Sequence, residues 1–219
     1  MSSQSELKEL SSPTFWDNRY TTSNTDQDGD ENPETTIESF EWFRDFSKLR
    51  PFLEKWLPGP GGEEKILHLG CGNSTLTADL HTLGYTHQLS VDFSHVVIQA
   101  MKLKYAALGG DTEWRVMDVR ALEMGDASVD VAVDKGTLDA FLYGSLWDRG
   151  GGEGECWEVA RVLKPGGRWL YITYRQPHFM KPLLVRDDKW EVEVEVLEDP
   201  DGGGGFEYFG FIMKRHQNR

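Results

Sequence analysis

The chain has 219 residues, of which 38% are hydrophobic, enough to bury the core of a single α/β domain. Its 23 basic and 37 acidic side chains give a net charge of −14, and no strongly basic stretch is present, so we expect no nucleic-acid partner. Two cysteines, Cys71 and Cys156, exclude a disulfide framework, and no Cys/His cluster has zinc-like spacing, so we expect a reducing compartment and no metal ion.

The first ten residues lack the apolar core of a secretory signal, and Glu6 and Glu9 argue against a transit peptide. No stretch approaches the ~18 apolar residues that a membrane span needs. These features predict a cytoplasmic protein with no membrane partner. The acidity either keeps the protein soluble or suits a basic partner, and the sequence leaves both readings open.

The N-terminal part begins with an aromatic patch at residues 15–20 (FWDNRY). The stretch 21–39 that follows is polar and acidic, with almost no apolar side chain, so we expect a mobile surface loop. Apolar side chains then recur at three- and four-residue steps from Phe43 to Trp56, which predicts a helix. Residues 58–62 (PGPGG) end it.

From residue 65 onward, predicted strands alternate with predicted helices. The strands are 65–69, 88–92, 113–118, 129–133 and 168–174, and the helices are 74–83, 94–107 and about 154–163. This alternation predicts an α/β fold with a mostly parallel sheet and helices on both faces. Two final strands, 190–197 and 206–214, flank a glycine run at 202–205, which predicts an antiparallel C-terminal hairpin.

A glycine turn, formed by Gly70, Cys71 and Gly72, follows the first of these strands. Glycine allows a sharp turn and a close approach of the backbone to a ligand. The third small residue of the dinucleotide fingerprint G-x-G-x-x-G is replaced by Thr75, which disfavours a nicotinamide dehydrogenase. Asp92, about 20 residues further on, stands where an acidic side chain binds ribose hydroxyls, or else it caps the helix that begins at Ser94.

Two further strand ends carry polar side chains. Asp118 is placed to accept a hydrogen bond from an adenine amine while Val119 packs on the ring and Phe93 covers its other face; the alternative is a turn aspartate. Residues 134–139 (DKGTLD) form a charged, glycine-containing loop, in which Asp134 and Lys135 are alternatively a surface ion pair.

Together these motifs and the turn 163–167 (LKPGG) resemble the seven-stranded S-adenosylmethionine-dependent methyltransferases. The resemblance is closer to the methyltransferase-like thirteen group, which includes lysine methyltransferases of translation elongation factor 1-alpha. It rests on residues 15–20, 42–43, 69–74 (LGCGNS), 91–94 (VDFS), 117–120 (MDVR) and 134–140 (DKGTLDA). It extends from about residue 15 to residue 214.

The resemblance implies a Rossmann-like class I methyltransferase that uses S-adenosylmethionine and releases S-adenosylhomocysteine. Residues 1–62 would form an arm, acidic loop and helix over the cofactor, and residues 63–219 the cofactor-binding core of one domain. The cofactor-binding residues that it implies are Trp16, Tyr20, Trp42, Gly70, Cys71, Gly72, Asp92, Phe93, Asp118, Val119 and Lys135.

Two positions and one loop depart from the wider pattern. His68 stands where many methyltransferases have an acidic residue, and we interpret it as a strand residue rather than a base. Asp134 replaces the glutamate of close relatives, and the acidic loop after Tyr20 is longer than usual, which leaves its path open.

The function that we expect is methyl transfer to a protein lysine, with elongation factor 1-alpha as the implied substrate. Desolvation in an aromatic pocket would help the amine lose its proton, so no dedicated base is needed and no catalytic residue is assigned. Asp139 is a candidate for orienting the amine. A small-molecule methyltransferase and a non-catalytic S-adenosylmethionine-binding module remain alternatives. The target lysine, the number of methyl groups and the oligomeric state stay open.

Overall fold

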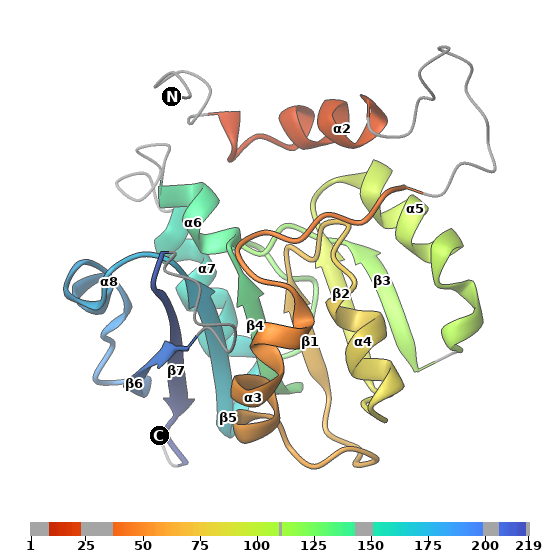
Figure 1. Ribbon diagram of the computed structural model, residues 1–219. Helices are drawn as coiled ribbons and strands as arrows, with labels where there is room; N and C mark the ends of the chain where they lie inside the picture. The colour runs from red at the N-terminus through yellow and green to blue at the C-terminus, as the bar shows by residue number, and fades with distance from the viewer. Residues whose placement is uncertain (1–8, 23–36, 110, 143–150, 199–205, 218–219) are drawn as a thin grey trace.

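The computed structural model describes residues 9–22, 37–109, 111–142, 151–198 and 206–217. Within these residues seven strands form one sheet in the order β3-β2-β1-β4-β5-β7-β6 (Figure 1). The five parallel strands are β1 (Ile66–Leu69), β2 (Gln88–Asp92), β3 (Thr112–Val116), β4 (Val129–Lys135) and β5 (Leu163–Thr173). The last two strands, β6 (Trp190–Leu197) and β7 (Tyr208–Arg215), pair antiparallel with each other, and β7 pairs antiparallel with β5.

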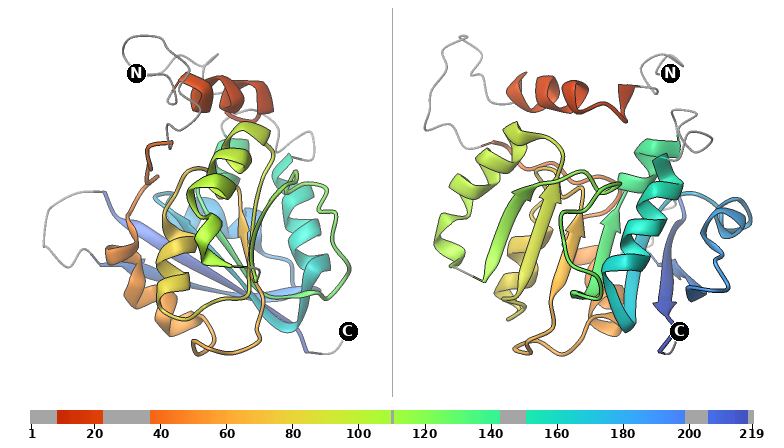
Figure 2. Two further views of the ribbon diagram at one scale, coloured as in Figure 1. Left: turned by 90° about the vertical axis from the view of Figure 1, so that its right-hand side faces the viewer. Right: turned by 180° about the vertical axis from the view of Figure 1, so that it is seen from behind.

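Helices cover both faces of the sheet, as the two rotated views show (Figure 2). α3 (Phe46–Trp56) and α4 (Leu76–Thr82) lie over one face, and α7 (Gly151–Val162) lies over the other. α5 (His95–Lys104) packs on β3 and β2 and is followed by a short 3-10 helix, Ala106–Leu108. The remaining helices are α2 (Pro13–Thr22), α6 (Thr137–Leu142) and α8 (Pro177–Leu184).

Alternate residues of the central strands enter opposite apolar layers. Leu170 and Ile172 of β5 pack in the layer that contains Leu53 of α3, whereas Trp169 and Tyr171 pack in the layer on the α7 side. All four β5 side chains are fully buried, as expected for a strand covered on both faces. The predicted mostly parallel sheet with an antiparallel hairpin is therefore confirmed. The glycine run at 202–205 lies outside the described residues.

The start of α3 differs from the prediction. The helix begins at Phe46, because the Asp45 side chain accepts a hydrogen bond from the Lys48 N–H and so caps its first turn. Phe43, expected inside the helix, instead has a φ of 67°. Such a value is a genuine outlier for a bulky side chain.

The sequence prediction also missed or misplaced other elements. It assigned no helix to α2, α6 or α8, and it treated the residues of α6 as a loop. It placed residues 163–167 in a turn, whereas the structure includes them in β5, with Gly166 at a φ of 78° and a register shift opposite β4. The polar stretch 21–39 is described only at its two ends, and residues 23–36 lie outside the described residues.

Among the described residues, no helix has the length and apolar character that a membrane crossing requires.

Candidate functional site

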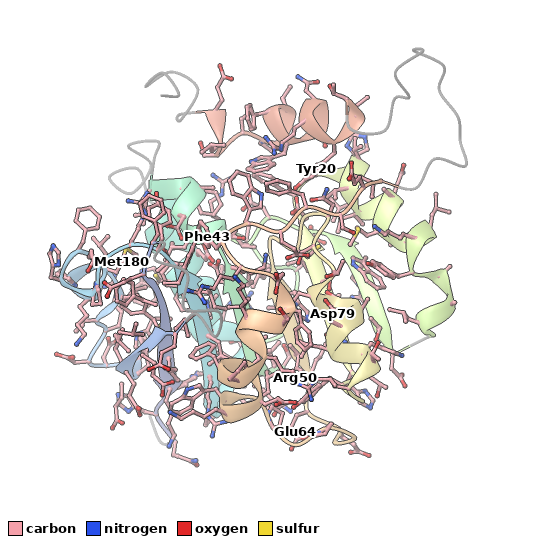
Figure 3. All side chains as sticks on the ribbon, viewed as in Figure 1. Tyr20, Phe43, Arg50, Glu64, Asp79 and Met180 are labelled. Atoms are coloured by element: carbon pink, nitrogen blue, oxygen red, sulfur yellow. The ribbon has the colours of Figure 1, made fainter. Side chains whose placement is uncertain are left out.

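The largest concentration of predicted site residues lies where the parallel strands end, beneath α2. Here the structure has a cavity of about 160 Å³. Tyr20 of α2 and Phe43 of the segment before α3 both lie at this edge of the sheet (Figure 3). The cavity is lined by ten of the predicted cofactor-binding residues, which are Trp16, Tyr20, Trp42, Gly70, Cys71, Gly72, Asp92, Phe93, Val119 and Lys135.

The floor of the cavity is the glycine turn after β1. Gly70 and Gly72 have φ values of 59° and 51°, the left-handed region that favours glycine. A Cβ at Gly70 would lie 2.1 Å from Thr137 Oγ1, and a Cβ at Gly72 would lie 2.9 Å from the Tyr20 hydroxyl. Only bare backbone fits at both positions. The turn therefore lines the cavity with backbone that carries no Cβ at these two positions.

Asp92 ends β2 and connects the glycine turn to α5. Its carboxylate accepts hydrogen bonds from the Gly72 N–H at 3.0 Å and the Ser94 N–H at 2.9 Å. The N-cap of α5 is Ser94 itself, so Asp92 is more than a helix cap. Burial raises the pKa of Asp92 to about 6, although these hydrogen bonds act in the opposite direction. A carboxylate has about four acceptor positions, so Asp92 retains capacity for a ligand.

Aromatic side chains form the roof. The Trp16 and Tyr20 rings of α2 stack at 5.8 Å between centroids, and Trp42 meets Trp16 edge-on at 6.0 Å. The Arg19 guanidinium lies over three rings: Trp16 at 5.8 Å, Phe40 at 5.5 Å and Trp42 at 5.4 Å. Cation–π attraction therefore connects α2 to the segment before α3.

Lys135, at the end of β4, pairs with Glu41. Its Nζ donates to Glu41 Oε2 at 2.8 Å, and Glu41 also accepts from the Thr75 N–H at 2.7 Å. Burial lowers the pKa of Lys135, with the Glu41 charge opposing this effect. Burial also raises the pKa of Glu41, but Lys135 and the hydrogen bonds outweigh it and leave that pKa below its usual value.

The alternative of a surface ion pair between Asp134 and Lys135 is wrong. Asp134 is fully buried, and its carboxylate accepts hydrogen bonds from the N–H groups of Thr137 and Leu138 at the start of α6. His68 lies in β1 as interpreted: burial lowers its pKa to about 4, and its Nε2 lies 2.7 Å from Gln88 Oε1.

Asp118 is the predicted residue that the structure does not bring to the cavity wall. Its neighbours Met117 and Val119 line the cavity, but its carboxylate accepts from Arg120 at both the backbone N, at 2.9 Å, and Nε, at 2.8 Å. Burial raises the pKa of Asp118, yet the Arg120 hydrogen bonds and charge outweigh it and lower the pKa. The carboxylate is thus engaged by a residue two positions away.

Sequence reasoning missed several residues of the site. Phe43, Thr137 and Tyr174 line the cavity without having been predicted as site residues. Asp139, the candidate for orienting the amine, also lines it and accepts hydrogen bonds from β5. The sequence feature that marks Asp139 and Thr137 as cavity residues is their position just after a strand. Glu41, which pairs with the cavity-lining Lys135 from a distant segment, carried no signal of its own.

A family model for a methyltransferase domain matches residues 66–167. EEF1A lysine methyltransferase 4 from Bos taurus is 34% identical to the chain over 217 residues, which cover 92% of this chain and 74% of the relative. The chain belongs to the methyltransferase family that contains EEF1A lysine methyltransferase 4. This excludes the nicotinamide dehydrogenase considered from the glycine turn and confirms the resemblance found in the sequence.

The Mus musculus methyltransferase of the same name is 38% identical over 180 residues, which cover 75% of this chain and 62% of the relative. The chain thus spans about three-fifths to three-quarters of the length of these two relatives. A solved SAM-dependent methyltransferase from Methanosarcina mazei superposes with a TM-score of 0.61 at 20% identity, covering 77% of this chain and 98% of that one. That likeness concerns the fold.

S-adenosylmethionine, the cofactor of this family, fits the residues present. Gly70 and Gly72 line the floor of the cavity with backbone that carries no Cβ. Asp92 has acceptor capacity for ribose hydroxyls, and the aromatic roof suits a sulfonium cation, which is attracted to ring faces. When bound, the cofactor supplies an activated methyl group. Among the described residues no cluster of His, Cys, Asp and Glu has the arrangement of a metal site.

Proposed function

We propose that this methyltransferase transfers the methyl group of S-adenosylmethionine to a lysine of elongation factor 1-alpha. The observation that supports S-adenosylmethionine as the methyl donor is the cavity, which has a glycine floor, an acidic side chain at the end of β2 and an aromatic roof. The identity of the methyl acceptor is proposed from relatives named EEF1A lysine methyltransferase 4, which are 34% and 38% identical to this chain.

In this proposal residues 1–62 form the arm and helix over the cofactor, and residues 63–219 form the core. Asp92 binds the ribose hydroxyls, Val119 and Phe93 pack on the adenine, and Lys135 lies near the methionine end. Asp118 contributes to the adenine end from beside the cavity. Its carboxylate accepts hydrogen bonds from Arg120 there. The proposal places the reaction in the cytoplasm, which agrees with the reducing compartment expected from the cysteine usage.

Methyl transfer needs a neutral nucleophile aligned with the methyl group and shielded from water. A lysine amine has a pKa of about 10.4 in water, and an aromatic, partly closed site favours its uncharged form. The roof formed by Trp16, Tyr20 and Trp42 provides that exclusion of water. Holding the two reactants in line then supplies much of the rate acceleration.

The test is incubation of the purified protein with labelled S-adenosylmethionine and an extract of cells that lack the enzyme. We expect one labelled band of the size of elongation factor 1-alpha, and no label with the variant Asp92→Ala, which should fold but not bind cofactor. Label confined to small molecules would favour a small-molecule methyltransferase. Cofactor binding without any label transfer would favour a non-catalytic binding module.

A further inference from the structure

Among the described residues, two carboxylate side chains line the cavity, and they lie at different places. Asp92 ends β2, whereas Asp139 is in the first turn of α6, which follows β4. In the sheet order, β1 separates β2 from β4. With adenosine at Asp92, as proposed above, Asp139 is left on the opposite side of the glycine turn.

The Asp139 carboxylate is held rigidly by three donors from β5 and the residues that follow it. The Tyr171 hydroxyl donates to Oδ2 at 2.6 Å, and the Thr173 hydroxyl and Arg175 Nε each donate to Oδ1 at 2.8 Å. These bonds use three of about four acceptor positions, and the one that remains is on Oδ2. The side chain is buried, yet it belongs to the cavity wall.

An aromatic wall stands beside this carboxylate. The Phe43 and Tyr174 rings meet edge-on at 5.4 Å between centroids. Phe43 also lies against Gly136, where a Cβ would come within 3.0 Å of its ring. These side chains line the same cavity as Asp139. We call the group of Phe43, Gly136, Asp139 and Tyr174 the acceptor end.

The backbone at Phe43 holds its ring in this place at a cost. Its φ of 67° is unfavourable for a bulky side chain, and the Arg44 N–H donates to Trp42 O across the tight turn. Strain of this kind persists only where surrounding contacts maintain it, and it is concentrated at functional sites. Here the ring packs on Gly136, itself at a φ of 91°, and also contacts the rings of Tyr174 and Tyr208.

We propose that the acceptor end receives the side chain of the target lysine, with its methylenes on the Phe43–Tyr174 wall and its amine at Asp139 Oδ2. This inference rests on the proposed function, because it names the acceptor subsite of the same cavity. A carboxylate at the end of an apolar wall selects a long side chain with a cationic tip. It makes Asp139 the group that contacts the reacting amine.

The chemistry balances with these residues alone. The lysine ammonium transfers one proton to the Asp139 carboxylate and becomes a neutral amine. The nitrogen lone pair then forms a bond to the methyl carbon of the donor, the carbon–sulfur bond breaks, and its electron pair remains on sulfur. The products are a methylated ammonium and S-adenosylhomocysteine, and Asp139 returns its proton to water.

The decisive variant is Asp139→Asn, because it keeps the shape of the side chain and removes its charge. In protein saturated with S-adenosylhomocysteine, we expect binding of N-acetyl-lysine methylamide, followed by NMR titration, to weaken by about tenfold or more. Calorimetry should give an S-adenosylhomocysteine Kd within about twofold of the unchanged protein. The matched control is Asp126→Asn, an exposed aspartate outside the cavity, which should alter neither constant.

A second variant, Phe43→Leu, keeps the inference testable if Asp139→Asn does not fold. We expect a raised KM for the acceptor protein, a nearly unchanged kcat and an unchanged S-adenosylhomocysteine Kd. Unchanged amine binding in the foldable variants would overturn the proposal. So would a loss of S-adenosylhomocysteine binding in Asp139→Asn, since Asp139 would then serve the donor.

These measurements separate this inference from the proposed function. If the unchanged protein fails to methylate elongation factor 1-alpha but binds the lysine amide through Asp139, the proposed acceptor protein is wrong and the acceptor end stands. If it methylates that factor and the Asp139→Asn variant retains the full kcat, the function stands and the acceptor end is wrong.

Discussion

In the proposed function, Asp92 is the side chain whose charge acts most directly on cofactor binding. Its pKa is raised to about 6, so it is ionised at pH 8 and gains a proton as the pH falls through 6. An ionised carboxylate accepts hydroxyl hydrogen bonds more strongly than its protonated form. We predict that the Kd for S-adenosylhomocysteine rises by up to about tenfold between pH 8 and pH 5. Calorimetry across this range measures it.

The control is Asp92→Asn, which cannot ionise. Its Kd should be about tenfold or more weaker at pH 8 and should show no step near pH 6. This comparison matters because Asp134, also buried, has a pKa raised to about 7. An equal pH dependence in both proteins would assign the titration to another group and contradict the role given to Asp92.

At the scale of single residues, the sequence predicted those side chains that lie next to strand ends along the chain. Asp92 and the glycine turn were found this way, because the carboxyl ends of parallel strands share one edge of the sheet. The same reasoning from strand ends predicted Asp118 at the cavity wall. It did not predict that Arg120, two residues further on, donates hydrogen bonds to the Asp118 carboxylate. Glu41 was missed because its partners are distant in the sequence: Ser74, Thr75 and Lys135.

Among the elements, the segment before α3 is connected to the core through Glu41, among other contacts. The Lys135 side chain is 7% exposed and that of Glu41 20%, so removing the negative charge leaves a buried cation without its charged partner. We predict that Glu41→Gln lowers the free energy of unfolding by about 1–3 kcal/mol. Urea denaturation followed by tryptophan fluorescence measures it.

An exposed ion pair supplies the comparison for that variant. Arg50 and Glu54 on α3 are 51% and 45% exposed, and water screens such pairs strongly. Glu54→Gln should therefore change the unfolding free energy by less than about 0.5 kcal/mol. If the two variants lose equal stability, Glu41 does not anchor the segment.

A separate prediction concerns α2, because the Arg19 guanidinium connects this helix to the aromatic rings of the neighbouring segment. Cation–π contacts at exposed sites contribute about 0.5–1 kcal/mol each. We predict that Arg19→Ala weakens S-adenosylhomocysteine binding by about twofold to tenfold, because the roof is less well held. Arg50→Ala on α3 is the control. Equal affinities for both variants would show that α2 does not cover the cofactor.

Two of the helices that the sequence failed to predict, α6 and α8, are short or contain a helix-breaking residue, whereas α2 buries only Tyr20 and so lacks an apolar periodicity. α6 has six residues, fewer than two turns, and directly follows Gly136. Its helix start is hidden because Asp134, which binds its first N–H groups, belongs to β4. α8 contains Pro182, although Pro177 suits its first turn. The strands and α4, α5 and α7 were predicted because their apolar periodicity extends over a whole element.

The whole molecule carries a net charge of −14, which favours association with a basic protein surface. Salt screens such long-range attraction but leaves buried contacts nearly unaffected. We predict that kcat/KM for the acceptor protein falls as NaCl rises from about 50 to about 300 mM, while kcat stays constant. Steady-state kinetics with labelled cofactor test this, and a kcat/KM independent of salt would mean that the acidity serves solubility alone.

The central claim is donor-dependent methylation of a lysine on elongation factor 1-alpha. It is tested most directly by incubating the purified factor with this protein and S-adenosylmethionine, then mapping methylated residues by mass spectrometry. The account predicts a methylated lysine that is absent without the cofactor and absent with Asp92→Ala. An unmodified factor, in a reaction where calorimetry shows that the protein binds S-adenosylhomocysteine, would contradict it.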